Sequence, residues 1–334
     1  MYVLELGGQD DAFAVREAAT AASDVTRIGP GLATARGIAD RARYLAYTRR
    51  ACALVGRAEP TVGAARALLD AATIDREGTV AVRAVDVRGT TGIDTQRVEG
   101  KLGAVLTDRG FAVDLDDPDH ELYAHFTAGE SDDSGVCTLG WLAVETVRDY
   151  GDRKPTDRPF FQPGSMDPIE ARAIANLAGA RPGTVVLDPM CGTGGLLAEA
   201  GLVGARVVGS DAQARMVEGT RRNLAHLLDD PGAAYPDGAG WDVFRSDAST
   251  LPVADGAVDA VLFDAPYGRQ SHIEGDLESL LGDALAEARR IADRAVLVAD
   301  REWQRAATDA GWTVTDRFER RVHRSLVRHV HVLR

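Results

Sequence analysis

The chain has 334 residues, 45% of them hydrophobic and 27% charged, a composition that is typical of a globular protein and excludes a disordered or fibrous chain. At roughly 150 residues per domain, this length allows about two domains. The 38 basic and 51 acidic residues give a net charge of −13, and no apolar run approaches the roughly 18 residues of a membrane span, so we expect no membrane partner.

The first half of the chain alternates irregularly between apolar patterns of strand and helix period, which predicts an α+β region. The predicted strands are 2–6, 79–87, 111–115 and 122–127, and the predicted helices are 10–22, 61–72 and 95–108. Residues 127–136 contain Glu130, Asp132 and Asp133 and are expected to form an acidic loop. Residues 149–159 have two prolines and no apolar periodicity, which indicates a linker.

The second half alternates regularly between strands and helices. The predicted helices are 168–178, 196–201, 212–228, 277–291 and 302–310, and the predicted strands are 184–187, 207–209, 242–245, 260–263 and 295–299, followed by a hairpin of 313–318 and 326–333. Strands that alternate with helices in this way form βαβ units. We therefore expect an α/β fold with a mostly parallel, doubly wound sheet.

A glycine-rich segment, Asp188-Pro189-Met190-Cys191-Gly192-Thr193-Gly194-Gly195, follows the first strand of this sheet. A dinucleotide site is not favoured, because Leu197 occupies the third glycine position and Asp188 would repel a pyrophosphate. A P-loop is excluded because no Gly-Lys-Ser/Thr follows. A cationic ligand without phosphate fits better, and S-adenosylmethionine, whose sulfonium and ammonium groups Asp188 could face, is such a ligand.

Two more carboxylates follow the next strands. Asp211 ends the second strand, where a carboxylate can accept hydrogen bonds from both ribose hydroxyls. Asp247 and Ala248 follow the third strand, where a carboxylate and a backbone amide can meet an adenine edge. A single loop aspartate is more often a turn or helix cap, but three at successive strand ends favour a ligand site. We interpret Cys191 as a small apolar filler, since the sequence supplies no base to activate it.

The fourth strand leads into Asp264-Ala265-Pro266-Tyr267-Gly268. Methylation of a planar exocyclic amine needs acceptors for both N–H groups, because its lone pair is delocalised into the ring. Asp264 and the Ala265 carbonyl could each accept one hydrogen bond, with Pro266 fixing the turn, and Asp264 could receive the released proton. Tyr267 could stack on a base that has left its helix. An ordinary strand-to-loop turn is the alternative.

These two segments resemble the S-adenosylmethionine loop and the D/N-P-P-Y motif of Rossmann-like amino-methyltransferases. Residues 158–166 (RPFFQPGSM), and Val217-Glu218-Gly219 after Asp211, are similar to the archaeal tRNA (guanine(10)-N2)-dimethyltransferase family in particular. Residues 80–83 and 94–97 are similar to THUMP sequences. One departure is Ala265, where the family has proline; since this position contributes its carbonyl, we expect activity to survive.

The resemblance implies a ferredoxin-like region over 1–55, a THUMP RNA-binding domain over 56–148, a linker over 149–159 and a Rossmann-like methyltransferase domain over 160–334. It also implies that S-adenosylmethionine contacts further residues of these motifs, which are Gly164, Ser165, Pro189, Cys191, Gly192, Thr193 and Gly194.

Arginines are concentrated near the end of the chain. Residues 317–334 hold six arginines against one Glu319, a local charge of +6 − 1 = +5 that marks a phosphate-binding surface. From this surface we expect Arg321 and Arg324, together with Arg269 after the predicted catalytic turn, to contact RNA. A second cluster spans residues 36–57. Intramolecular ion pairs are the alternative for any single arginine.

The sequence predicts neither a metal nor a disulfide. Cys52, Cys137 and Cys191 are far apart and lack C-x-x-C spacing, and His329 and His331 share a strand face with no carboxylate or cysteine beside them. The first residues have no basic stretch and do not read as a secretory signal, so we expect a cytoplasmic protein.

The basic residues are almost all arginines, because only Lys101 and Lys154 are lysines. An acidic surface with arginine in place of lysine suits a cytosol of molar salt, where the Debye length falls to about 3 Å. We therefore hypothesise a halophilic, haloarchaeal source; the alternative is an acidic protein of GC-biased composition. Under the halophilic hypothesis, the net charge does not exclude a nucleic acid as partner.

The halophilic hypothesis predicts that the melting temperature rises as KCl is raised from dilute to molar concentration, because salt screens the repulsion among excess carboxylates. Thermal melts at several KCl concentrations check this. A melting temperature that falls as KCl rises would contradict the hypothesis.

Taken together, the sequence predicts S-adenosylmethionine-dependent methylation of the N2 amino group of guanosine 10 in tRNA, with a second methylation to the dimethyl product as an option. The alternatives are a methyltransferase for another guanosine or exocyclic amine, and a non-catalytic tRNA-binding protein that has kept a ligand pocket. We favour a monomer.

Overall fold

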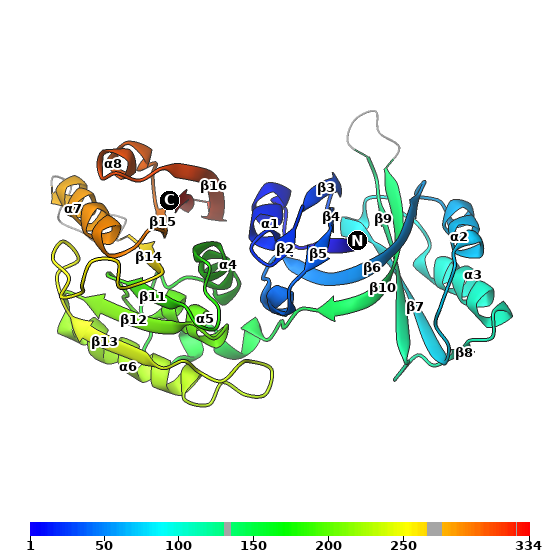
Figure 1. Cartoon of the computed structure of the whole chain (residues 1–334), viewed down its shortest axis with the longest axis horizontal. Coiled ribbons are helices and arrows are strands. Elements are labelled where there is room, and N and C mark those ends of the chain that lie inside the picture. Colours follow the sequence, from blue (N-terminus) through cyan, green and yellow to red (C-terminus); the bar gives the residue numbers. More distant parts are fainter. Residues whose placement is uncertain (130–134, 266–275, 325) are drawn as a thin grey trace. The chain divides into compact units, whose positions relative to one another are not determined.

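The computed structural model describes residues 1–129, 135–265, 276–324 and 326–334. The chain divides into two compact units, Met1–Val147 and Arg148–Arg334 (Figure 1). Pro266, Tyr267 and Arg269, for which the sequence predicts roles in base binding, lie outside the described residues. No helix in the described ranges is both long enough and apolar enough to span a membrane.

The first unit contains an eight-stranded sheet with the order β3-β4-β1-β6-β10-β9-β7-β8. β7 runs parallel to its neighbours β8 and β9, and the other pairs are antiparallel. The strands are β1 (Tyr2–Leu6), β3 (Thr26–Gly29), β4 (Leu32–Ala35), β6 (Thr48–Ala58), β7 (Thr79–Asp86), β8 (Ala112–Val113), β9 (His120–Thr127) and β10 (Val136–Glu145); β2 (Ala22–Ser23) pairs separately with β5 (Gly37–Ile38).

Helices α2 (Val62–Ala71) and α3 (Thr95–Asp108) cover one face of this sheet (Figure 1). Each begins at a side chain that caps its free amides, Thr61 for α2 and Asp94 for α3. Their apolar residues pack against β7, β9 and β10 to form the core of the unit. The remaining helices of this unit are α1 (Asp11–Ala18), η1 (Asp40–Tyr44) and η2 (Val87–Gly89).

The second unit contains a seven-stranded sheet with the order β13-β12-β11-β14-β15-β17-β16. The first five strands of this order are parallel, and β17 and β16 are antiparallel to their neighbours. The strands are β11 (Val185–Asp188), β12 (Arg206–Asp211), β13 (Trp241–Arg245), β14 (Ala260–Asp264), β15 (Ala295–Ala299), β16 (Val314–His323) and β17 (Leu326–Leu333).

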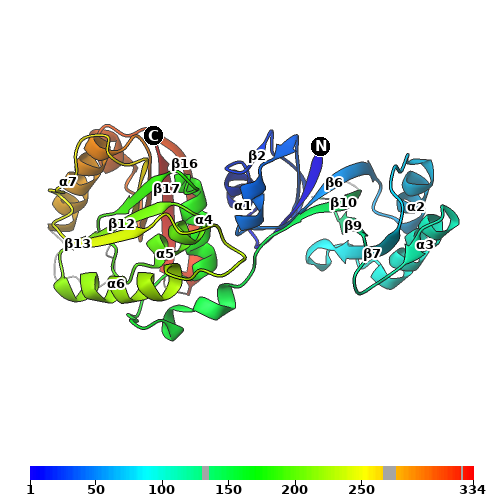
Figure 2. The same cartoon turned by 60° about the horizontal axis from the view of Figure 1, so that its bottom comes forward.

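Helices lie on both faces of this sheet, so the expected doubly wound α/β fold is confirmed (Figure 2). Helices α7 and α8 pack on one face in the main apolar core, and α4, α5 and α6 contact one another in series. The helices are α4 (Pro168–Ala178), α5 (Gly195–Leu202), α6 (Ala214–Leu228), α7 (Asp276–Ile291) and α8 (Gln304–Asp309). The strand order reverses between β11 and β14, and ligands of doubly wound sheets bind at the carboxyl ends of the strands at such a point.

Residues 149–159, predicted to form a linker, pack on the second unit as two short 3-10 helices, η3 (Tyr150–Arg153) and η4 (Pro155–Asp157). The side chains of Arg153 and Arg158 are buried there. The segment lacks apolar periodicity because the side chains that it buries here are those of two arginines.

In the first unit the predicted helix 10–22 is too long, because α1 ends at Ala18 and the chain enters β2. The predicted strand 111–115 is reduced to the two residues of β8. Strands β3, β4, β6 and β10 match no predicted element. Since β6 extends from residue 48 to residue 58, it crosses the boundary expected between the ferredoxin-like and THUMP regions; that subdivision stays a prediction.

Candidate functional site

Three carboxylates lie at the ends of adjacent parallel strands. Asp188 is the last residue of β11, Asp211 of β12 and Asp264 of β14, and β11 pairs with both of the other strands. The structure therefore brings these three predicted residues together at the edge where the strand order reverses.

Asp188 is the most deeply buried of the three, with 1% of its surface exposed. Its Oδ1 accepts a hydrogen bond from the backbone N–H of Met190 at 3.0 Å. Burial raises the pKa of Asp188 well above its ordinary value, and the negative charges of Asp264 and Asp211 raise it further. A cationic ligand would reverse this effect, because it would stabilise the charged carboxylate.

Asp211 fastens the glycine loop to the second strand. Its Oδ2 accepts from the backbone N–H of Gly192 at 3.1 Å, and its Oδ1 accepts from Gln213 at 2.8 Å. Burial raises the pKa of Asp211, although both backbone hydrogen bonds act in the opposite direction.

The loop between β11 and α5 needs glycine at two positions. Gly192 and Gly194 have φ values of +53° and +77°, the left-handed region that other residues adopt with strain. A Cβ at Gly194 would also lie 2.8 Å from the Thr220 methyl group. Contact of the ligand with this loop, including Pro189 and Thr193, stays a prediction.

Cys191 is 5% exposed, and its backbone N–H donates to the Ser210 carbonyl at 2.9 Å. Burial raises the pKa of its thiol well above the ordinary value. A buried neutral thiol is a poor nucleophile, which agrees with the interpretation of Cys191 as an apolar filler.

Helix α6 fixes the glycine loop through hydrogen bonds to its carbonyl groups, a role that was not predicted from the sequence. The Thr220 hydroxyl donates to the Gly192 carbonyl at 2.7 Å. Asn223 Nδ2 donates to the carbonyls of Thr193 and Phe160 at 2.9 and 2.8 Å, and its Oδ1 accepts from the Phe160 N–H at 2.9 Å. Two polar residues three positions apart on the buried face of an amphipathic helix are the signal that could have indicated this role.

Residues 160–166 are brought to the same loop. The hydroxyls of Ser165 and Thr193 lie 3.1 Å apart, and the Gly164 carbonyl accepts from Arg328 Nη2 at 3.3 Å. The Phe160 ring occupies the space above Gly219, where a Cβ would lie 2.0 Å from it. Ser165 therefore lies beside the glycine loop, and its contact with the cofactor stays a prediction.

We predict that Asn223→Ala lowers the free energy of unfolding by about 2 kcal/mol, because it leaves buried backbone groups of Phe160 and Thr193 without partners. Urea denaturation measures this change. Glu218→Ala, at an exposed position of the same helix, is the matched control and should change stability much less. Equal effects of the two substitutions would contradict the positioning role of Asn223.

Asp247 is exposed, and its Oδ1 accepts from the backbone N–H and the hydroxyl of Ser249 at 2.9 and 2.7 Å. These bonds lower the pKa of Asp247, so it is a charged group that stabilises its own turn. Ala248 beside it is buried. Contact of these two residues with adenine stays a prediction.

Asp264 is half-buried, and Ala265 is 2% exposed. The Ala265 N–H donates to the Val298 carbonyl at 2.9 Å, which extends the ladder between β14 and β15 by one bond. The position that replaces the family's proline is thus held by the sheet itself.

Five of the six arginines of residues 317–334 separate into two groups. Arg317 pairs with Glu302 at 3.2 Å, Arg320 pairs with Glu170 at 3.3 Å, and Arg328 is buried. Arg321 and Arg324 are exposed near the turn between β16 and β17. Within the described ranges, no group of three or more histidine, cysteine or acidic residues could hold a metal ion.

Comparison with known proteins places this site in a family. Residues 155–329 match the RMKL-like methyltransferase domain family (UPF0020). The chain is 37% identical over 260 residues to the tRNA (guanine(10)-N2)-dimethyltransferase of Methanothermobacter thermautotrophicus, covering 75% of this chain and 72% of that one. It is 30% identical over 275 residues to the enzyme of that name from Methanocaldococcus jannaschii, covering 79% and 73%.

Among solved structures, the crystal structure of TrmN from Thermus thermophilus aligns over 99% of this chain and 98% of that one, with 21% identity and a TM-score of 0.49. The doubly wound sheet and the matched domain define a methyltransferase of the Rossmann-like class. More particularly, the chain belongs to the family of the tRNA (guanine(10)-N2)-dimethyltransferases.

Proposed function

We propose that this chain transfers a methyl group from S-adenosylmethionine to the exocyclic N2 of guanosine 10 in tRNA. The observation that carries the proposal is the gathering of Asp188, Asp211 and Asp264 at adjacent strand ends around a glycine loop, in a chain of this family. A second methylation to the dimethyl product is part of the proposal, since the relatives carry that name.

The residues at this edge fit S-adenosylmethionine. Burial disfavours the charged form of the Asp188 carboxylate, and the ligand carries an ammonium and a sulfonium that would stabilise it. Asp211, at the end of the second strand, is placed to accept the ribose hydroxyls. Gly192 and Gly194 have no side chain to obstruct the ligand, and Asp247 with Ala248 would meet the adenine.

When bound, S-adenosylmethionine supplies an electrophilic methyl group. Asp264 and the Ala265 carbonyl would accept the two N–H bonds of guanine N2, which draws its lone pair out of conjugation and toward the methyl carbon. The N–C bond forms as the C–S bond breaks, the bonding pair stays on sulfur, and Asp264 receives the proton from nitrogen. In this proposal Pro266 fixes the turn, and Tyr267 stacks on the base.

The first unit, with its proposed THUMP domain, would bind tRNA and decide which nucleotide reaches Asp264. Arg321, Arg324 and Arg269 are the proposed phosphate contacts of the second unit. Because they are exposed, Arg321 and Arg324 are better candidates than Arg317 and Arg320, whose charges are engaged by glutamates. We propose a monomer that acts in the cytoplasm.

A methyl-transfer assay at high KCl, with labelled S-adenosylmethionine and unmodified tRNA followed by nucleoside mass spectrometry, tests this function. We expect methylated guanosine at position 10, and none when that base is replaced. The ratio of monomethyl to dimethyl product gives the multiplicity. Cofactor binding with no methyl group on any tRNA would contradict the proposal and favour a non-catalytic RNA-binding protein.

We predict that binding of S-adenosylmethionine releases protons and tightens as pH rises above the ordinary aspartate pKa of 3.8. In the free protein, burial raises the pKa of Asp188 and Asp211. At a pH between 3.8 and these raised pKa values, both side chains are protonated in the folded protein and ionised in the unfolded chain. Their contribution to the free energy of unfolding therefore falls as pH rises above 3.8. A cationic ligand stabilises the charged carboxylates and therefore lowers the pKa of both side chains.

Calorimetric titration in two buffers of different ionisation enthalpy measures the released protons. Asp188→Asn should release fewer protons, and its affinity should depend less on pH. An affinity of the wild-type protein that is independent of pH would argue against a titrating Asp188.

A further inference from the structure

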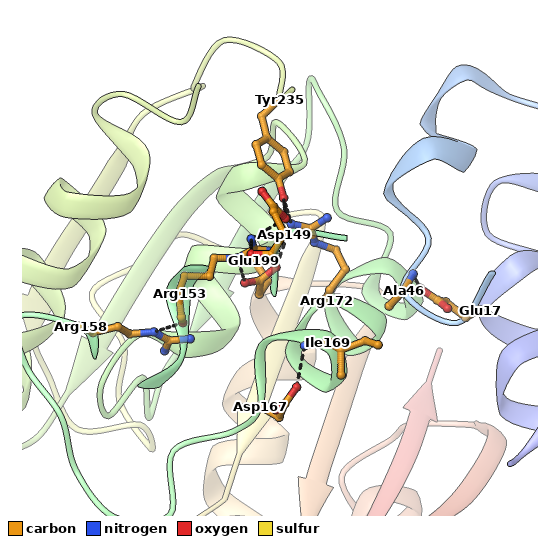
Figure 3. Close-up of polar contacts among 10 residues, drawn as sticks. All are labelled: Glu17, Ala46, Asp149, Arg153, Arg158, Asp167, Ile169, Arg172, Glu199 and Tyr235. Atoms are coloured by element: carbon orange, nitrogen blue, oxygen red, sulfur yellow. Dashed lines mark hydrogen bonds and ion pairs between the residues drawn. The ribbon is translucent and has the colours of Figure 1, made fainter. Parts of the chain in front are cut away.

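Arg158 places a positive charge in the interior of the second unit. Its side chain is 6% exposed, and its Nε donates to the Arg153 carbonyl at 3.2 Å (Figure 3). Its two terminal nitrogens, Nη1 and Nη2, are buried and have no hydrogen-bond partner among the residues that the structure describes. Burial lowers the pKa of Arg158. A buried guanidinium with two unpaired nitrogens is costly unless an anion binds to it.

The nearby carboxylates are occupied by other groups. Glu199 is fully buried and accepts from Arg153 at 2.6 Å, and it lies 2.8 Å from Arg172 (Figure 3). Asp167 is exposed, and its Oδ1 accepts from the backbone N–H of Ile169 at the start of α4. Neither carboxylate forms a hydrogen bond with Arg158 in the structure, so the protein itself leaves this charge without a direct partner in the described ranges.

The guanidinium lies beside the first residue of α5. A Cβ on Gly195 would lie 3.1 Å from Arg158 Nη1. No side chain caps this helix, whose N-cap is Gly194, so the free amides of its first turn add a second attraction for negative charge. Two independent features, a buried unpaired cation and an uncapped helix start, therefore converge directly after the glycine loop.

We propose that Arg158, with the first turn of α5, binds the carboxylate of the methionine part of S-adenosylmethionine. This inference rests on the proposed function. Asp188, at the other end of the loop, attracts the cationic groups of the same ligand. The site thus has a negative and a positive end, which together orient the amino-acid part of the ligand and aim its methyl group.

The test compares two neutral-sulfur probes by calorimetric titration of the full chain at constant KCl. One probe is S-adenosylhomocysteine, and the other is its decarboxylated analogue, which keeps the amine. We expect the wild-type protein to prefer S-adenosylhomocysteine. Arg158→Met should weaken binding of S-adenosylhomocysteine about 10- to 100-fold, the size expected for a charge-assisted hydrogen bond, and leave binding of the analogue unchanged.

Arg206→Met is the matched control. It removes an equal charge from the same unit. Arg206 is exposed, pairs with Asp242, and is the first residue of β12, at the opposite end of that strand from Asp211. Its affinity for both probes should equal that of the wild-type protein.

Three results would overturn the inference. The first is equal affinity of the wild-type protein for both probes, which needs no variant and so does not depend on whether Arg158→Met folds. The second is an Arg158→Met protein that still prefers S-adenosylhomocysteine, and the third is an equal loss of affinity for both probes. In each of these cases the proposed function would still hold if the wild-type protein transferred methyl groups to tRNA in the activity assay. A wild-type protein that binds neither probe would instead overturn both.

Discussion

Asp264→Ala should reduce methyl transfer by at least about 100-fold, the size typical of removing a positioned proton acceptor or a charge aimed at the transition state. Asp264 is the last residue of β14, at the point where the strand order reverses. The substitution removes one of the two proposed acceptors for the guanine N2 hydrogens. Single-turnover assays with saturating tRNA and S-adenosylmethionine measure the chemical step.

The same variant should keep its affinity for S-adenosylhomocysteine and tRNA, because the proposed role of Asp264 is confined to the reacting nitrogen. S-adenosylhomocysteine is the suitable probe, since its sulfur is uncharged and is insensitive to the lost carboxylate. Asp283→Ala, on the exposed side of α7, is the control and should be as active as the wild-type protein. Full activity of Asp264→Ala would remove this residue from the mechanism.

Most helices and strands of the second unit could be predicted from the sequence to within two residues, because each has one dominant local signal; an exception is β16, which continues to His323, whereas the predicted strand ends at residue 318. The Asp167 side chain caps the start of helix α4, and Gly179, with a φ of +89°, follows its last residue. Its predicted range, 168–178, is confirmed. The buried strands β14 and β15 are short apolar runs between turns, which is the pattern of parallel strands covered on both faces.

The first unit was predicted less well, because long-range pairing decides its central strands. β10 contains register shifts between Leu139 and Gly140 and between Leu142 and Val144, and these interrupt the alternation that identifies a strand. In β6, Arg50 faces Glu5 and Glu145, so a charged residue stands where an apolar one would signal the strand. Neither feature is visible before the partners are known.

The carboxylates of the site were predicted because they end strands, whereas Asn223 was missed because its role depends on what lies opposite α6. Thr220 and Asn223 on one helix face indicate a buried polar role, but nothing near position 223 identifies its partners, residues 160 and 193, which are 63 and 30 positions away. The same holds for Glu199. Its place in the apolar segment Leu196–Leu202 predicts burial but not its partners.

Glu199 joins the segment before the methyltransferase core to helix α5 (Figure 3). It is fully buried, and its two oxygens accept from Arg153 at 2.6 and 3.1 Å. Arg172, also fully buried, lies 2.8 Å away. The rings of Tyr150 and Tyr235 lie 5.0 to 5.8 Å from these guanidinium groups and cover the cluster. Glu199 thus pairs with two buried cations, and Asp149 pairs with Arg153 as well, at 2.6 Å.

We therefore expect Glu199→Gln to lower the free energy of unfolding by about 3–5 kcal/mol, because it leaves the charge of Arg172 buried without a counter-charge and leaves Arg153 with Asp149 alone. In a unit of this size the melting temperature should fall by roughly 6–20 °C, which differential scanning calorimetry measures. Asp242→Asn is the control. It breaks a pair with Arg206 in which the two side chains are 61% and 49% exposed, and it should cost less than about 1 kcal/mol. If the two substitutions had equal effects, the buried cluster would not hold the segment in place.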